Sequence, residues 1–432
     1  MSTRALLSAP ILPTLARLSA PGVLLVAFQS MVSVGDTYFV GRLGTEPLAG
    51  LALVFPLIML LQMTSAGAMG GGVSSAIARA LGAGDDAAAR RIVVHALVIA
   101  AGMGIGFTLL VLFLGRLLYS LLGGEGETLA QALRYSNIVF AGAIAVWVAN
   151  TFSSVLRGTG NMLVPALTLI GAATVHLPLS GTLVPRIGIA GAAIAYVTTF
   201  TLAALVMAAI VWRSSLLRPQ AADWTLERRF FREILRVGAI SVLNALQTVL
   251  TAVILTGFVG RYGAAALAGY GVGLRLELLQ IPLVFAVGQA LVVLVGTHIG
   301  AGRAARARRI AWVGAGLAAS ISLAIGVTVS VFPLAWVGLF SADPAVLESG
   351  SDYLRTVAPF YPLLGAGIAL YFASQGAGQV LRPMLAGTVR LALVVAGGLA
   401  AVSLQGVFTV IAAAMIAFGA LTMGLVHLAK WK

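Results

Sequence analysis

The sequence predicts an all-α membrane protein with twelve transmembrane helices arranged in two six-helix lobes. Three observations lead to this fold class. The chain of 432 residues is 60% hydrophobic and only 9% charged, whereas soluble domains contain about 25% charged residues. Apolar stretches of about 20 residues, each long enough to cross ~30 Å of hydrocarbon as a helix, recur along the whole chain. Finally, the second half of the sequence repeats motifs of the first half.

The apolar stretches define the expected spans. Their length and continuity indicate helices, because the strands of a membrane barrel alternate in polarity over about ten residues. In chain order, we expect spans at residues 20–40, 48–72, 92–115, 131–156, 163–184, 188–212, 237–260, 267–297, 310–337, 352–374, 383–403 and 406–428. The first six belong to an N-terminal lobe, residues 1–212, and the last six to a C-terminal lobe, residues 237–432.

A polar stretch, residues 213–236, connects the two predicted lobes on the cytoplasmic side. It is rich in both signs of charge, with Asp223, Glu227, Arg232 and Glu233 among its members. We expect a short amphipathic helix there, lying at the membrane surface. A plain loop is the alternative.

The net charge of +14 follows membrane topology. With the N-terminus placed in the cytoplasm, 19 of the 27 Lys and Arg residues fall in expected cytoplasmic segments and six in outer segments. The other two, Arg275 and Arg390, lie inside spans. This bias obeys the positive-inside rule and sets both termini in the cytoplasm. We therefore expect no nucleic-acid partner. The absence of cysteine excludes a disulfide framework.

The internal repeat predicts how the lobes are related. Val40-Gly41-Arg42 returns as Val259-Gly260-Arg261, and Gly82-Ala83-Gly84 returns as Gly300-Ala301-Gly302, at offsets that differ by a single position. Each repeat holds six spans, an even number, so both enter the membrane from the same face. We therefore expect a pseudo-two-fold axis along the membrane normal and a central cavity near the midplane. Tandem repeats of this kind are typical of secondary transporters.

Further motifs resemble those of the bacterial multidrug and toxic compound extrusion family. They are Arg157-Gly158-Thr159-Gly160-Asn161 with Pro165, Gln375-Gly376-Ala377-Gly378-Gln379 with Pro383, Asp36-Thr37-x-Phe39-Val40-Gly41, and Arg275-Leu276-Glu277 with Val295-Gly296 and Gly300-Ala301-Gly302. The resemblance runs through essentially the whole chain. It implies two lobes forming a V in the bacterial inner membrane, and efflux of organic, often cationic, compounds driven by H⁺ or Na⁺. Beyond that coupling ion we expect no cofactor and no protein metal site. We also expect a monomer surrounded by membrane lipid.

Ionisable side chains inside the hydrocarbon are the first candidates for function, because each costs at least about 2.5–3.5 kcal/mol at a helix centre. Of the thirteen acids, only Asp36 and Glu277 lie well within spans. With a rise of about 1.5 Å per residue, Asp36, His176 and Tyr196 reach a similar height in the outer half of the membrane. We expect Asp36 to be functional. The alternatives are a structural hydrogen bond for Asp36 and a buried neutral imidazole for His176.

The resemblance strengthens this expectation. In bacterial relatives the first span carries a proline, a glutamine and the cation-coupling aspartate, at the spacing of Pro21, Gln29 and Asp36. The family's fifth span usually offers an asparagine followed after four residues by an aspartate, and its sixth span a threonine. Here those positions hold His176, Ser180 and Tyr196. Losing one carboxylate removes a hard oxygen ligand for Na⁺ and adds a group that titrates near neutral pH. The sequence therefore favours protons over Na⁺.

Other polar residues inside spans are candidates for lining the cavity: Gln29, Asn150, Gln247, Arg275, Glu277 and Gln280. A lone intramembrane amide can instead join two helices. Arg275 and Glu277 do not face each other, because residues two apart point in different directions on a helix; a functional role and structural pairing with another span both stay open. Pro21, Pro56 and Pro282 lie inside spans, where proline kinks a helix and frees backbone groups.

Three other classes of protein are alternatives. A flippase for lipids or lipid-linked oligosaccharides shares the helical plan, and it is the alternative function. It should line its cavity with several positive charges, whereas only Arg275 and Arg390 lie within spans. An intramembrane enzyme needs a catalytic constellation such as His-Glu-x-x-His, which the sequence lacks. A channel is usually an oligomer around a symmetric pore. In the repeat, Asp36 maps to Leu255 and His176 to Val394, so we expect the coupling chemistry in the first lobe only.

Overall fold

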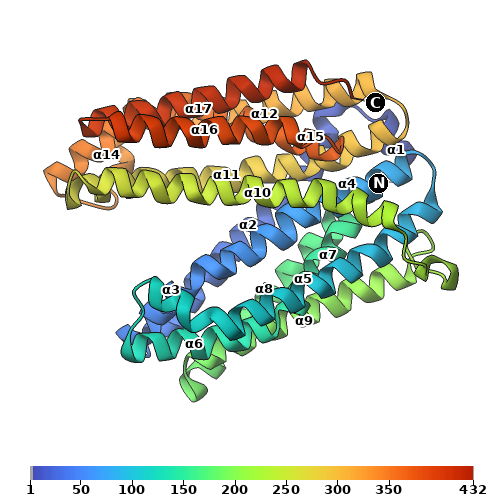
Figure 1. Ribbon diagram of the computed structural model, residues 1–432, viewed down its shortest axis with the longest axis horizontal. Coiled ribbons are helices and arrows are strands. Elements are labelled where there is room, and N and C mark those ends of the chain that lie inside the picture. Colours follow the sequence, from blue (N-terminus) through green and yellow to red (C-terminus); the bar gives the residue numbers. More distant parts are fainter. Residues whose placement is uncertain (1–2, 432) are drawn as a thin grey trace. The chain divides into compact units, whose positions relative to one another are not determined.

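The computed structural model describes residues 3–431, and all regular structure in that range is helical (Figure 1). Eleven helical stretches are long and apolar enough to cross a membrane, and the pair α6–α7, bent by 49°, supplies a twelfth. The predicted all-α membrane fold is confirmed. The helices are α1 (Thr3–Ser8), α2 (Ile11–Gly41), α3 (Thr45–Gln62), η1 (Met63–Met69), α4 (Gly70–Gly82), α5 (Asp86–Leu121), α6 (Gly126–Ala141), α7 (Ala143–Gly158), α8 (Leu163–Ile187), α9 (Ile189–Arg213), η2 (Ala221–Trp224), α10 (Arg228–Gly260), α11 (Ala264–Gly300), α12 (Ala304–Val331), α13 (Pro333–Val337), α14 (Pro344–Val357), η3 (Ala358–Phe360), α15 (Tyr361–Gly376), α16 (Leu381–Ala400) and α17 (Leu404–His427).

The bounds of the helices repeat with the spacing of the sequence motifs. α6 begins at residue 126 and α7 ends at residue 158. α14 begins at residue 344 and α15 ends at residue 376, so each bound of the second pair lies the same number of residues after its counterpart in the first. Gly160 and Gly378, which follow α7 and α15, have φ angles of 83° and 72°. This left-handed conformation suits glycine and ends helices. The repeated glycine motif is therefore explained by the same chain reversal in each half.

The chain divides into two compact units. Residues 20–238 form the first unit, and residues 4–19 together with the chain from Ala239 onward form the second. The division therefore falls inside α2 and inside α10 rather than in loops. The expected linker, residues 213–236, lies within the first unit.

The N-terminal residues belong to the second unit because arginines of that unit hold their backbone. Arg303 Nη1 donates a hydrogen bond of 3.1 Å to the carbonyl oxygen of Leu7, and Arg306 Nη2 donates one of 2.7 Å to that of Ala9. Sequence patterns give no indication of such side-chain to backbone contacts.

Within the described residues, the helical part of the expected linker is the beginning of a longer helix rather than a separate short one. After α9 the chain forms only the short turn η2, and residues 228–236 are the first turns of α10. Before α10 the linker is held by ion pairs with α5, and within α10 its apolar side chains Phe230 and Ile234 pack into the first unit. Asp223 of η2 is buried against Arg90 of α5, with 3.0 Å between Arg90 Nε and Asp223 Oδ2.

The prolines inside spans have different consequences. α2, α3 and α11 continue through Pro21, Pro56 and Pro282. In the second span the α-helical pattern gives way, beyond Pro56, to the π-helical turn η1. The expected ninth span, 310–337, is interrupted: α12 ends at Val331 and Pro333 begins α13, since proline cannot continue the hydrogen bonding of the preceding helix.

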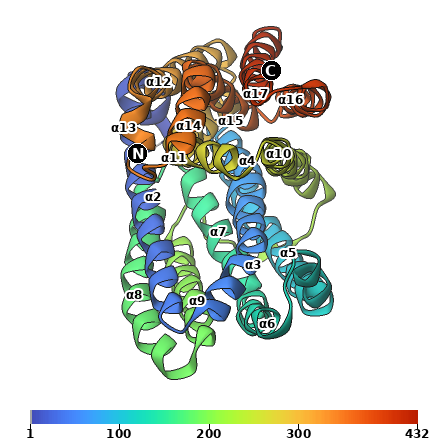
Figure 2. The same cartoon turned by 90° about the vertical axis from the view of Figure 1, so that its left-hand side faces the viewer.

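Each unit packs around its own apolar core. In the first unit, Trp147, Phe140 and Tyr119 are fully enclosed between α5, α6 and α7. In the second, Tyr361 and Phe408 are buried in the interior between α15 and α17. Within the first unit α8 packs along α9, and α2 lies beside them (Figure 2). This arrangement brings side chains from the first, fifth and sixth spans together.

Candidate functional site

Asp36 of α2 lies against His176 and Ser180 of α8 in the interior of the first unit. His176 Nε2 is 2.9 Å from both Oδ1 and Oδ2 of Asp36. Ser180 Oγ donates a hydrogen bond of 2.7 Å to Asp36 Oδ1. Only 8% of Asp36 and 1% of His176 is exposed. His176 and Ser180 share one face of α8 because they are four residues apart. The structure thus brings together three of the predicted coupling residues.

The contacts of His176 favour one arrangement of its protons. Thr199 Oγ1 donates its only hydrogen to the carbonyl oxygen of Ala195, at 2.6 Å. With its hydrogen placed there, Thr199 accepts from His176 Nδ1, 3.2 Å away, and Nδ1 carries a hydrogen in this tautomer. Nε2 meets the Asp36 carboxylate, and two hydrogen-bond acceptors approach to 2.9 Å only with a proton between them. In this tautomer the pair holds one proton more than a neutral imidazole and an ionised carboxylate.

That extra proton has two possible positions. On Nε2 it makes an imidazolium–carboxylate ion pair; on Asp36 it makes a carboxylic acid that donates to neutral His176. In both cases the net charge of the pair is zero, which fits its burial, because an unpaired buried charge is costly. Removing the proton leaves a negative charge and two acceptors facing each other. The arrangement can therefore bind one proton and respond to its loss.

The sixth span contacts the site through Thr199 rather than through Tyr196. The resemblance pointed to Tyr196 as the position of the family's threonine, yet Thr199, one turn further along α9, touches His176. The Tyr196 hydroxyl instead accepts a hydrogen bond of 2.7 Å from Gln62 Nε2. Gln29, predicted to accompany Asp36, is exposed on α2.

A second polar cluster surrounds Asn150 of α7. Asn150 Nδ2 donates to Gln62 Oε1 at 3.0 Å and to Ser65 Oγ at 2.8 Å, and Gln62 continues to Tyr196. Gln62 ends α3 and Ser65 lies in η1, a π-helical turn of the kind often found at functional sites. Asn150 is a predicted cavity residue. In the structure it is buried and joins three helical segments, and its cavity role stays a prediction.

The predicted residues of the second unit lie at separate places. The Tyr353 hydroxyl donates a hydrogen bond to the buried carboxylate of Glu277. Gln280 Nε2 donates to Ser322 Oγ at 2.8 Å, and Gln247 Nε2 to Thr388 Oγ1 at 2.8 Å. As the sequence indicated, Arg275 does not pair with Glu277 two residues away. Its guanidinium instead lies 5.2 Å from the ring centroid of Phe340.

Sequence reasoning missed Thr199, Gln62, Ser65 and Tyr353. Each carries a hydroxyl or an amide without charge, and such side chains are common in apolar spans, where they bond neighbouring helices. For Thr199 a signal existed, because it lies within one helical turn of Tyr196, the position that the resemblance indicated. For Tyr353 none existed, because its partner Glu277 lies on a different helix far away in the sequence.

Comparison with known proteins gives a match in both halves of the chain. The family model MatE matches residues 21–182 and again residues 239–400. These two blocks coincide with the internal repeat. Together they cover more than half of the chain.

Individual relatives span nearly the same length as this chain. An FAD transporter of Shewanella oneidensis is 27% identical over 376 residues, 85% of this chain and 82% of the relative. The probable multidrug resistance protein NorM of Thermotoga maritima is 24% identical, over 86% of this chain and 81% of the relative. Among solved structures, a MOP superfamily transporter from Pyrococcus furiosus aligns with a TM-score of 0.90 at 24% identity, covering 98% of this chain and 97% of that one. This last likeness concerns the fold alone.

Proposed function

Because the chain belongs to the MatE family of multidrug efflux transporters, we propose that it is a secondary active antiporter. It exports organic cations in exchange for protons by alternating access. The observation that carries this proposal is the buried Asp36–His176 pair, whose hydrogen bonding accommodates one added proton. The pair supplies a carboxylate whose charge depends on proton binding.

Protons and cationic substrates compete for this charge. When the pair has lost its proton, it carries one negative charge in a region of low dielectric, which attracts an organic cation. When a proton enters, the charge is neutralised and the cation is released. A ligand can drive the conformational cycle only through a difference in affinity between the two states. We therefore place proton uptake in the outward-open state, where it releases the substrate, and proton release in the inward-open state.

The composition of the site supports protons rather than Na⁺. Na⁺ is a hard cation that prefers oxygen ligands. In this site the neighbour of both Asp36 carboxylate oxygens is an imidazole nitrogen. Ser180 Oγ offers an oxygen, but its hydrogen points to Asp36. The site thus offers Na⁺ one carboxylate, and it has a nitrogen at the position where Na⁺ would need a second oxygen ligand.

The substrate class has a second candidate. The relative from Shewanella oneidensis carries the name FAD transporter, and FAD is an anion at neutral pH. To export such an anion, the site would have to bind the substrate more tightly in its protonated, neutral form than in its deprotonated, negative form. The two candidates therefore predict opposite effects of the Asp36 charge on substrate binding.

Reconstitution in proteoliposomes tests both. Efflux of ethidium and of FAD would be measured with a pH gradient alone and with a Na⁺ gradient alone. We expect ethidium efflux with the pH gradient only, and no such efflux with Asp36→Asn. Efflux driven by Na⁺ alone would contradict proton coupling, and efflux of FAD without ethidium would contradict the cationic substrate.

We also propose that the chain is a monomer in the bacterial inner membrane, with both termini in the cytoplasm. Support comes from the positive-inside bias and from a repeat that supplies both lobes in one chain. The absence of native cysteine makes the topology easy to test. A single cysteine placed at either end should react with a membrane-impermeant maleimide only after the cells are opened.

A further inference from the structure

Three arginines form an exposed row at the beginning of α10. Arg228, Arg232 and Arg236 are spaced by four residues and all three are exposed. Residues four apart lie on the same face of a helix. We call these three residues the arginine stripe. It lies outside the Asp36 site and takes no part in the function proposed above.

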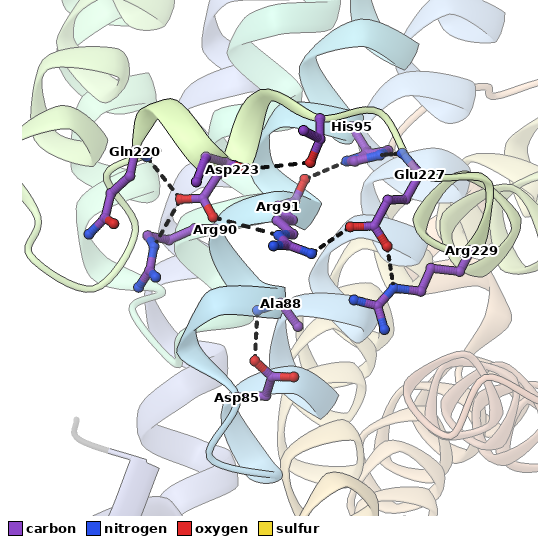
Figure 3. Close-up of polar contacts among 11 residues, drawn as sticks. Asp85, Ala88, Arg90, Arg91, His95, Gln220, Asp223, Glu227 and Arg229 are labelled. Atoms are coloured by element: carbon purple, nitrogen blue, oxygen red, sulfur yellow. Dashed lines mark hydrogen bonds and ion pairs between the residues drawn. The ribbon is translucent and has the colours of Figure 1, made fainter.

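Two acids near the stripe, Asp223 and Glu227, are paired with arginines of α5 (Figure 3). Asp223 lies between Arg90 and Arg91 of α5, with Arg90 Nε 3.0 Å from Asp223 Oδ2 and Arg91 Nε 3.8 Å from Oδ1. Arg91 Nη1 also lies 2.5 Å from Glu227 Oε1. These contacts draw two linker carboxylates toward α5.

The third acid, Glu233, is taken by α4. Arg79 Nη2 lies 2.9 Å from Glu233 Oε1. Arg229, next to the stripe, pairs with Glu227 Oε2 at 2.8 Å and lies over the ring of Phe230. In the part of the chain that the structure describes, the stripe itself has no acid within ion-pair distance. Its three charges remain available to an external anion.

The opposite face of α10 fixes the direction of the stripe. Phe230, Ile234 and Val237 are buried in the first unit, and two of them belong to one apolar cluster with Ile92 and Met207. Rotation of the helix about its axis would expose these side chains to solvent. The stripe is therefore held outward by packing.

The stripe spans the depth of the lipid headgroups. Eight residues of helix cover about 12 Å, while the headgroup layer is roughly 5–7 Å thick on each side of the hydrocarbon. α10 continues from the stripe into a membrane span. Just before it, Trp224 and Leu226 are 54% and 57% exposed, and tryptophan favours the membrane interface. We therefore infer that part of the stripe lies level with lipid phosphates.

The stripe is not inherited from the repeated scaffold. The residues at the corresponding positions of the first half are Ala9, Pro13 and Arg17, so only Arg236 has a basic counterpart. Pro13, the counterpart of Arg232, lies inside α2, so a helix forms at that position without arginine.

We propose that the arginine stripe is a binding site for the phosphate headgroups of anionic phospholipid in the cytoplasmic leaflet. Guanidinium groups bind phosphate with paired, charge-assisted hydrogen bonds. Basic residues at the cytoplasmic surface attract anionic lipid in proportion to their number. The linker acids are held in ion pairs with α4 and α5, so they do not compete with lipid phosphate for the stripe.

Binding of fluorescent lipid to the purified full-length protein tests this site. Dansyl-labelled phosphatidylglycerol and dansyl-labelled phosphatidylcholine with the same chains would be titrated, with energy transfer from tryptophan as the readout. At about 1 kcal/mol for each arginine, the variant Arg228→Gln/Arg232→Gln/Arg236→Gln should bind phosphatidylglycerol on the order of 100-fold more weakly at low salt. Binding of phosphatidylcholine should not change.

Controls separate the site from net charge and from free phosphate. The variant Arg116→Gln/Arg186→Gln/Arg261→Gln removes the same charge from exposed positions elsewhere and should retain wild-type affinity for phosphatidylglycerol. Equal loss in both variants, or no loss in the stripe variant, would overturn the proposal. Full displacement of the lipid by millimolar inorganic phosphate would assign the site to soluble phosphate instead. Because Asp36 is untouched, transport in the stripe variant reports separately on the antiport proposal.

Discussion

His176 Nε2 lies 2.9 Å from both carboxylate oxygens of Asp36, although the two residues are 140 positions apart in the chain. The contact joins α2 to α8 inside the first unit. With His176 Nδ1 donating to Thr199, the contact contains a shared proton. Proton loss would place a carboxylate against an imidazole lone pair, so we expect α2 and α8 to separate locally when the proton leaves.

Asp36→Asn should yield a folded protein without proton-driven efflux. The amide keeps the size of the side chain and can still accept from Ser180, but it cannot change its charge. Ethidium efflux driven by a pH gradient should fall to the rate of empty vesicles. Asp352→Asn, at an exposed acid in the second unit, is the matched control and should transport normally. Wild-type efflux in Asp36→Asn would contradict the coupling role.

His176→Asn combined with Ser180→Asp should move the coupling toward Na⁺. The two substitutions replace the imidazole nitrogen and the hydroxyl by an amide and a carboxylate, so the site gains the oxygen ligands that a hard cation prefers. Efflux should then respond to a Na⁺ gradient imposed at constant pH. The single variants serve as controls. A double variant driven only by a pH gradient would show that these two positions do not select the ion.

Thr199→Val should reduce the number of protons carried per substrate. Without the threonine oxygen, the hydrogen on Nδ1 has no acceptor, which costs about 1–3 kcal/mol for a buried group. The neutral imidazole can avoid this cost by carrying its hydrogen on Nε2, where it bonds ionised Asp36 directly. The pair then needs no added proton.

The measurement for Thr199→Val is simultaneous recording of ethidium efflux and internal pH with pyranine. Thr201→Val is the control, since Thr201 is exposed and bonds only the carbonyl oxygen of Val197. An unchanged ratio of protons to substrate in Thr199→Val would contradict the assigned proton positions.

The sequence predicted the parts of the fold that depend on hydrophobicity and repetition. Apolar length located the spans, and depth along each span put Asp36 and His176 at one height, where the structure joins them. Depth does not specify which face of α9 points to His176, so it indicated Tyr196 rather than Thr199. The path of the linker before α10 could not be predicted, because it depends on pairing with Arg90 and Arg91, which lie far earlier in the chain.

The linker pairs lead to a final prediction about stability. Asp223 is buried and accepts from Arg90 Nε at 3.0 Å and from the backbone N–H of Gln220 at 2.8 Å. Asp223→Ala leaves the largely buried guanidinium of Arg90 without its carboxylate. Breaking a buried pair costs about 3 kcal/mol, so the melting temperature of the purified protein should fall by several degrees.

Glu227 offers the contrasting case on the same linker. Its pair with Arg229 is exposed, with 64% of the Arg229 side chain accessible to solvent, and exposed pairs contribute about 0–1 kcal/mol. Arg229→Ala should therefore leave the melting temperature nearly unchanged. If Asp223→Ala were equally neutral, the linker would not be held by its buried ion pair. In that case only the ion pairs of Glu227 and Glu233 would keep acidic side chains away from the arginine stripe.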